Sequence, residues 1–261
     1  GMMTGMARMD YKGIGGNMAA YINMAYCDWL HTQEKDEEYT PFAKQLYSLP
    51  EMHAWRAPGM NCMTELKAQM AGSENPPYTN RFADLEHPAN ENKGCGGVMR
   101  AAPCGMLKMP DLPDNGDAWA LQGAMAAAIT HSHVMGWVPA AMLADMVHMI
   151  FTEDGMPLEE IVRESLKRML RLFGPEIGAA EGCEEQPGES DGRFAALMAF
   201  RELMTRAMKL AASDKPEREA IHALGGGWVG DEALAIAVFC VLRHPDNMAD
   251  CLSAAVTHDG D

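Results

Sequence analysis

The sequence lacks the features that mark several large classes of protein. Its seven cysteines are an odd number and are scattered without a C-x-x-C pair. This distribution argues against a disulfide framework and against a zinc ribbon, and it fits a reducing compartment such as the cytoplasm. No charged-then-apolar leader is found, and no apolar run reaches the roughly 18 residues of a membrane span. We therefore expect a soluble, cytoplasmic protein with no membrane partner.

Positive charge is also scarce. The chain has 21 lysines and arginines against 37 aspartates and glutamates, so its formal net charge is −16. No stretch of lysine and arginine is long enough to follow a phosphate backbone, which argues against generic nucleic-acid binding. An anionic ligand would have to be bound by a local cluster of donors and cations. With 48% hydrophobic residues over 261 positions, the chain can bury a core as one domain or a closely fused pair.

Alternating apolar and polar positions, the pattern of a half-buried strand, are not found, and nearly every apolar pattern has a helical period. Helices are predicted after Asn17 (preceded by Gly15-Gly16), from Pro157 to Gly174-Pro175, after the caps Asp117 and Asp231, and over 137–151, 192–212 and 247–256. The acidic stretch 181–192 is predicted to be a solvated loop. The 24 methionines are spread over most helices, so they are interpreted as core filler rather than as a groove for a partner helix. The fold class is predicted to be all-α.

The segment ENKGCGGVMRAAP, residues 91–103, is the most unusual stretch. Gly94, Gly96 and Gly97 would let the main chain bend sharply and bring its amides close to a ligand. The segment is neither a P-loop nor a dinucleotide fingerprint, because position 99 is methionine where the third glycine should stand. Flanking cations, Lys93 and Arg100, together with backbone donors suit phosphate oxygens. On the glycines alone, a tight turn between helices is the alternative.

A pair of histidines, His131 and His133, follows an alanine-rich predicted helix in ITHSHVMGW, residues 129–137. Their i, i+2 spacing places them on opposite sides of a helix but on one side of an extended segment. This spacing is weak as a metal-binding signal. For each histidine the residues leave open a structural or surface role and a contact with a ligand.

Taken together, segments along the whole chain resemble the ADP-ribosylglycohydrolase family, which includes the dinitrogenase reductase-activating glycohydrolases. They are YCDWLHTQ (26–33), RAPGMNCMTEL (56–66), NENKGCGGVMRAAP (90–103), THSHVMGW (130–137), GGGWVGDEALAIAV (225–238) and AAVTHDGD (254–261). The resemblance implies a single all-α domain over residues 1–261, a compact orthogonal bundle of helices. It also implies a monomeric, metal-dependent hydrolase that releases ADP-ribose from a modified protein side chain or a small acceptor.

The resemblance assigns candidate residues to substrate binding. They are Asn90, Lys93, Gly94, Cys95, Gly96, Gly97, Met99, Arg100 and His131. Asn90 and His131 match positions that line the substrate pocket, and residues 93–97 could offer a cation and backbone donors to the diphosphate. Met99 and Arg100 are expected to shape and brace the loop, with contact between Arg100 and the ligand left open. We expect this loop, His131 and Asp261 to converge on one cleft.

The resemblance also implies two Mg²⁺ or Mn²⁺ ions held by carboxylate oxygens. Asp261 matches the first aspartate of the family's Gly-Asp-x-Asp metal motif, and Asp259 does not match it. The family's N-terminal acidic segment and its Asp-Asp-Thr motif are not found. We therefore expect an internal part of a longer protein whose catalytic acidic residues lie outside these 261, so that this chain retains no metal and is inactive. The alternative is a non-catalytic relative, crystallin-like or binding ADP-ribose or a nucleotide.

Overall fold

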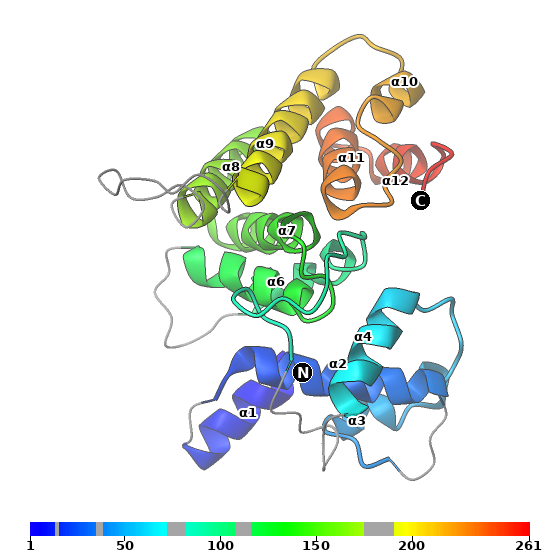
Figure 1. Cartoon of the computed structure of the whole chain (residues 1–261). Helices are drawn as coiled ribbons and strands as arrows, with labels where there is room; N and C mark the ends of the chain where they lie inside the picture. The colour runs from blue at the N-terminus through cyan, green and yellow to red at the C-terminus, as the bar shows by residue number, and fades with distance from the viewer. Residues whose placement is uncertain (14–15, 35–38, 72–81, 108–115, 175–190) are drawn as a thin grey trace. The chain divides into compact units, whose positions relative to one another are not determined.

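The structure is a computed structural model that describes residues 1–13, 16–34, 39–71, 82–107, 116–174 and 191–261 (Figure 1). The chain divides into two compact units. One unit consists of residues 1–92 and 128–132, and the other consists of residues 93–127 and 133–261. The described residues are mainly helical and contain no strand, apart from an isolated antiparallel bridge between Gly94 and Val229. The predicted all-α fold class is confirmed.

The first unit is organised around its longest helix. It contains α1 (Met2–Lys12), α2 (Met18–Glu34), α3 (Lys44–Tyr47), the 3₁₀ turn η1 (Pro50–Met52) and α4 (Met60–Ala71). The α2 helix contacts α1, α3 and α4. Asn17 caps α2 as predicted, because its side-chain oxygen accepts a hydrogen bond from the amide of Ala19 at 2.9 Å. The buried carboxylate of Asp28 accepts hydrogen bonds from the Tyr39 hydroxyl and the Phe42 amide, which fastens the chain after α2.

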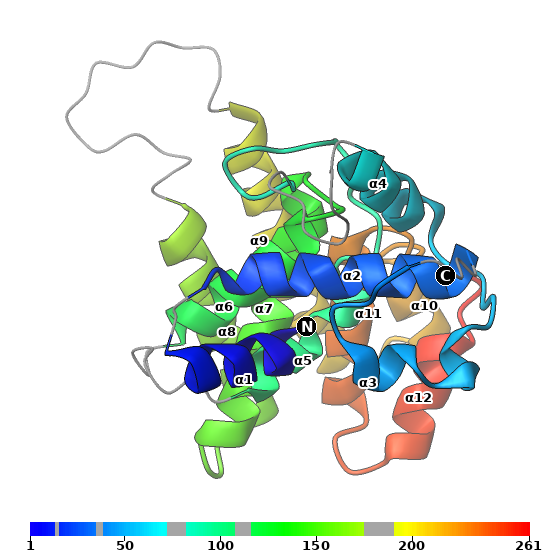
Figure 2. The same ribbon diagram turned by 90° about the horizontal axis from the view of Figure 1, so that it is seen from below.

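The second unit is built around α7. Its elements are η2 (Val98–Arg100), α5 (Ala102–Met106), α6 (Asp117–Ala128), α7 (Val134–Thr152), α8 (Leu158–Phe173), α9 (Asp191–Ala211), α10 (Glu217–His222), α11 (Gly230–Arg243) and α12 (Met248–Val256). The α7 helix contacts α5, α8, α9 and α11, while α11 also contacts α9 and α12 (Figures 1 and 2). Among the described helices α7 alone is long and apolar enough to cross a membrane, but 78% of its apolar window is buried, as in a core helix.

Small residues let helices approach α7 closely. A Cβ added at Gly123 on α6 would lie 2.5 Å from the carbonyl oxygen of Ala140, and one at Gly105 on α5 would lie 2.1 Å from that of Ala144. Both distances are shorter than any Cβ tolerates, so glycine is required where these backbones meet. The small residues of α6 and α5 therefore allow tight contact with α7.

Most of the predicted helices are confirmed, with corrections at their starts. The helix predicted at Pro157 is α8, and the helices predicted over 137–151, 192–212 and 247–256 are α7, α9 and α12. Asp117 and Asp231 were expected to be caps, but α6 begins at Asp117 and α11 begins at Gly230, so both carboxylates lie in first turns. There they face the positive end of the helix dipole. Three parts of these predictions lie outside the described residues: Gly15 before the Asn17 cap, Pro175 after α8, and positions 181–190 of the predicted solvated loop.

Methionine is a major component of the core. Buried methionines occur on α1, α2, α4, α7, α8 and α9, among them Met142, Met169 and Met204, while others such as Met3 and Met248 are exposed. An unbranched thioether fills irregular gaps between helices. The interpretation of methionine as core filler therefore holds for these six helices.

Candidate functional site

In the second unit the glycine loop, residues 93–100, is fastened to the start of α11. The amide of Cys95 donates a hydrogen bond to the carbonyl oxygen of Trp228 at 3.1 Å, and the amide of Gly230 donates to that of Lys93 at 2.8 Å. These bonds flank the bridge between Gly94 and Val229. Two glycine-rich segments that are far apart in the sequence therefore form one structure.

Backbone angles that favour glycine occur in the second of these segments, residues 225–230. Gly225 and Gly227 have φ of 125° and 82°, whereas Gly94, Gly96 and Gly97 have no positive φ. The first loop does turn sharply at residues 95–97, as expected, but the backbone angles that only glycine adopts readily occur at residues 225–227. The carboxylate of Glu232 stabilises this turn by accepting hydrogen bonds from the amides of Gly226 and Gly227 at 3.0 and 3.1 Å.

The glycines of the first loop have different roles. A Cβ at Gly97 would lie 2.5 Å from the carbonyl oxygen of Gly136, so Gly97 lets η2 pack directly on α7. The amide of Cys95 is used within the protein, whereas the amides of Gly96 and Gly97 donate to no acceptor among the described residues. The donors left for a ligand are therefore those of Gly96 and Gly97, and that of Cys95 serves the fold.

Asp261 meets the glycine loop although the two are far apart in sequence. Its amide donates to the carbonyl oxygen of Gly226 at 2.8 Å, and the Cys95 thiol donates to its Oδ2 at 2.8 Å, across 166 positions. Gly260 permits this approach, because a Cβ there would lie 2.1 Å from the Gly226 oxygen. Asp259 instead forms an ion pair with Arg218. The structure thus brings the loop and Asp261 together, as predicted.

Asp231 is a candidate that sequence patterns missed, since they indicate only a helix cap. Its Oδ1 is buried and has no hydrogen-bond partner among the described side chains. Burial raises the pKa of the Asp231 carboxyl, and the charge of Glu232 raises it further. The backbone amides of Asp231 and Glu232 and, to a smaller extent, the Lys93 ammonium lower it. A perturbed carboxyl beside a cation at the rim of the loop is typical of functional sites. No signal in the sequence distinguishes Asp231 from an ordinary first-turn aspartate.

The side chains around the loop differ in exposure. Trp228, a second residue that was not singled out, is 64% exposed although its backbone is bonded to Cys95. Met99 is 74% exposed, so its side chain does not brace the loop as expected. Arg100 does, because its Nη2 lies 3.5 Å from the carbonyl oxygen of Ala126 at the end of α6. The result is a loop with a rigid base and an exposed indole beside it.

In the first unit, Asn90 binds the segment that contains His131. Its Nδ2 donates to Glu65 Oε2 at 2.9 Å and to the Thr130 carbonyl oxygen at 3.1 Å. Its Oδ1 accepts from the amides of Asn92 and Ser132 at 2.9 and 3.2 Å. All four hydrogen-bonding positions of this amide are therefore used, and Asn90 holds two segments of the first unit in register.

The 129–132 segment is also held by α4. The side chains of Asn61 and Gln69 donate to the carbonyl oxygens of Thr130 and Ile129 at 2.6 and 2.8 Å. His131 is only 3% exposed, and its Nδ1 lies 2.8 Å from the Thr130 hydroxyl. Because His131 belongs to the first unit and the glycine loop to the second, their convergence stays a prediction.

The second histidine of the pair has a structural role. His133 precedes α7, and its Nδ1 accepts a hydrogen bond from the amide of Met135 at 3.0 Å. An acceptor at this position satisfies one of the unpaired amides of the first helical turn. For His133 the structural alternative is therefore correct.

These observations agree with the comparison to known families. The ADP-ribosylglycohydrolase model matches residues 3–261, essentially the whole chain. The chain belongs to the ADP-ribosylglycohydrolase family. Comparisons with curated proteins and with solved structures gave no match. Membership of the family indicates hydrolysis of ADP-ribose linkages, and ADP-ribosylglycohydrolases are generally metal-dependent.

The residues described here do not form a metal site of the kind this family uses. Within the described ranges no group of three or more His, Cys, Asp and Glu side chains could hold a metal ion. Asp261 offers one carboxylate, and its Oδ2 already accepts from Cys95. A pair of hard divalent ions needs several oxygen ligands, so Asp261 by itself does not fit the requirement.

Proposed function

We propose that this ADP-ribosylglycohydrolase binds the ADP-ribose group of a modified protein side chain or small acceptor at the glycine loop and hydrolyses its linkage with the help of Mg²⁺ or Mn²⁺. One observation carries the proposal. The Cys95 thiol lies 2.8 Å from Asp261, so the loop that suits a diphosphate meets the carboxylate that matches the family's metal motif. Both are fastened to the same 226–230 segment.

In this proposal the diphosphate lies on the loop. The amides of Gly96 and Gly97 are the donors without acceptors, and the Lys93 ammonium adds a cation, a combination that suits phosphate oxygens. Asp231 at the start of α11 lies within electrostatic range of that ammonium, which lowers the carboxyl pKa that burial raises. The exposed indole of Trp228 offers a flat apolar surface on which the adenine base stacks.

The chemistry proposed is hydrolysis at the anomeric carbon, where positive, oxocarbenium-like charge develops. Carboxylates near that carbon stabilise such charge, and Asp261 is the residue whose position at the loop supports this role. Because the described residues do not complete a metal site, we assign no step to a metal ion.

The test separates binding from turnover. Calorimetric titration with ADP-ribose measures binding, and release of ADP-ribose from modified arginine and serine peptides measures turnover, with Mg²⁺ or Mn²⁺ and with a chelator. We expect binding by the wild-type chain and a clear loss of affinity in Gly96→Val. Failure of ADP-ribose to bind would contradict the proposal. Binding without turnover in every form of the protein would instead favour the non-catalytic relative, and chelator-resistant turnover would contradict the metal dependence.

A further inference from the structure

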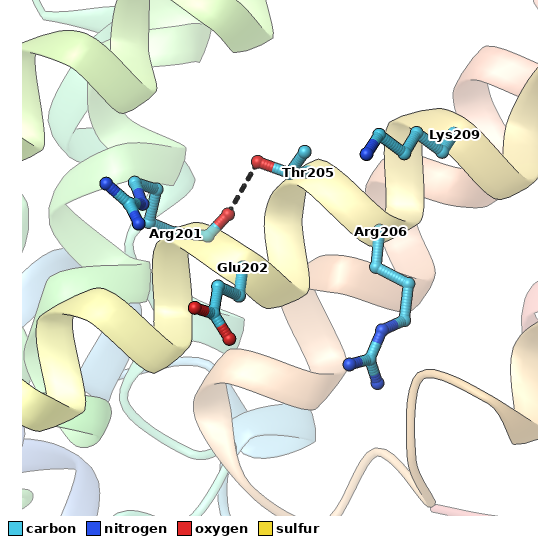
Figure 3. A pocket seen from close by; sticks show the side chains of 5 residues that line it. All are labelled: Arg201, Glu202, Thr205, Arg206 and Lys209. Atoms are coloured by element: carbon cyan, nitrogen blue, oxygen red, sulfur yellow. Dashed lines mark hydrogen bonds between the residues drawn. The ribbon is translucent and has the colours of Figure 1, made fainter.

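The α9 helix carries a cationic face that the proposed site does not use. Arg201, Glu202, Thr205, Arg206 and Lys209 line a hollow of about 470 Å³ on its exposed side. Figure 3 shows Arg201, Thr205 and Lys209 on one side of the helix, with Glu202 and Arg206 on the other. Their i, i+4, i+8 spacing aligns the first three over about 12 Å of helix. We refer to Arg201, Thr205 and Lys209 as the α9 basic face.

Within the part of the chain that the structure describes, the cations of this face have no ion-pair partner, in contrast to those of α8. On α8, Arg163 pairs with Glu159 and Lys167 pairs with Glu164. The side chains of Arg201 and Lys209 have no hydrogen-bond or ion-pair partner among the described residues. This contrast is informative because the chain has 37 acidic side chains against 21 basic ones, so a counter-ion is easily supplied. A cationic face left open in an acidic protein is suited to an anionic partner.

We propose that the α9 basic face docks an acidic peptide segment of the protein substrate. The assignment to the substrate rests on the proposed function, whereas the docking itself does not. The spacing suits this occupant. Carboxylates at i and i+4 of an extended peptide are about 13 Å apart, and Arg201 and Lys209 of the α9 basic face are about 12 Å apart along the helix. Nucleic acid is disfavoured, since it requires a longer cationic track than this face and the net charge of the chain is −16.

The test measures binding of a defined probe by fluorescence anisotropy. The probe is a labelled extended peptide with glutamates at i and i+4, and its glutamine counterpart is the negative probe. The variant Arg201→Gln/Lys209→Gln removes two charges of the face. Its matched control, Arg163→Gln/Lys167→Gln, removes the same charge from exposed positions of α8. We expect the α9 variant to bind the glutamate peptide roughly tenfold more weakly than the wild-type chain and to lose most of the salt dependence of that binding. The control should change the affinity for the peptide by less than about twofold.

Several outcomes would overturn this inference. They are equal binding of the two peptides by the wild-type chain, equal losses in the two double variants, and tighter binding of a labelled single-stranded oligonucleotide than of the acidic peptide. Titration of the same variants with ADP-ribose separates the inference from the proposed function. We expect unchanged ADP-ribose affinity in the α9 variant, and a loss there would mean that the face belongs to the nucleotide site. If no form binds ADP-ribose while the acidic peptide still binds, the docking face stands and the proposed function fails.

Discussion

Replacing Arg168 by alanine should destabilise the second unit strongly, because this residue neutralises a buried charge. Its guanidinium forms an ion pair with Asp145 of α7, whose side chain is 0% exposed, and its Nε lies 3.6 Å from Asp117. The substitution would leave the Asp145 carboxylate buried without a cation, a change that costs about 3–5 kcal/mol. Arg168 is itself 21% exposed, so water can partly replace it, and we expect the lower end, about 3 kcal/mol.

This loss should depend on pH. Burial raises the pKa of the Asp145 carboxyl, although Ser165 and Arg168 lower it, so removal of Arg168 raises it further. A folded-state pKa above the unfolded value means that the stability contributed by this carboxyl is fully present below the unfolded pKa and is lost as the pH rises through the folded pKa. The deficit of the variant relative to wild type should therefore be largest near pH 7 and shrink as the pH falls toward about 4.

Thermal unfolding followed by circular dichroism measures the effect. A loss of about 3 kcal/mol corresponds to a fall in Tm of roughly 6–12 °C for a chain of this size. The control is Arg163→Ala on the same helix, where both members of the ion pair with Glu159 are more than half exposed, and it should cost less than about 0.5 kcal/mol. Equal Tm losses in the two variants, or a deficit for Arg168→Ala that is independent of pH, would refute the reasoning.

Three further predictions concern the site. Gly97→Val should lower Tm, because its Cβ would lie 2.5 Å from a carbonyl oxygen of α7. Gly96→Val should leave the protein folded and weaken ADP-ribose binding, because a β-branched side chain obstructs the approach of the ligand to the backbone. Unchanged affinity in the folded Gly96 variant would indicate a purely structural loop. Trp228→Ala removes an indole that is 64% exposed, so Tm should not change, while calorimetry should record a loss of about 1–3 kcal/mol in ADP-ribose binding. Trp228→Phe should retain most of the affinity. An equal loss in both variants would argue against stacking. Cys95 is the one described cysteine that is not buried, and burial raises the pKa of the Cys104 thiol to about 11. Iodoacetamide should therefore modify Cys95 before the other described cysteines, and ADP-ribose should slow that reaction in peptide mapping; alkylation at an unchanged rate would place the ligand elsewhere.

The elements that could be predicted from the sequence are those with local signals. The α8 helix follows from its apolar period between Pro157 and Gly174, and α2 from the Asn17 cap. In contrast, α1 begins without a side-chain cap, and it contains Gly5, which is required only because it packs against Tyr21. That contact is tertiary, so no local propensity reveals it.

The site shows the same limit. The loop and Asp261 were found through segments that resemble a family, and their contact confirms that the segments belong together. Asp231 and Trp228 were missed because their roles depend on burial and exposure: the Asp231 oxygen is buried without a partner, and the Trp228 indole is largely exposed. Burial or exposure of a single side chain produces no periodicity or motif spacing in the sequence. Likewise the steric need for Gly97 arises from the backbone of α7, which is distant in sequence.

The most direct test of the central claim is a crystal structure of the chain with ADP-ribose. The account predicts the diphosphate within hydrogen-bonding distance of the Gly96 and Gly97 amides and of the Lys93 ammonium, with adenine stacked on Trp228 and the ribose end directed toward Asp261. A nucleotide bound at any other surface, with the glycine loop empty, would contradict the claim that this loop is the ADP-ribose site.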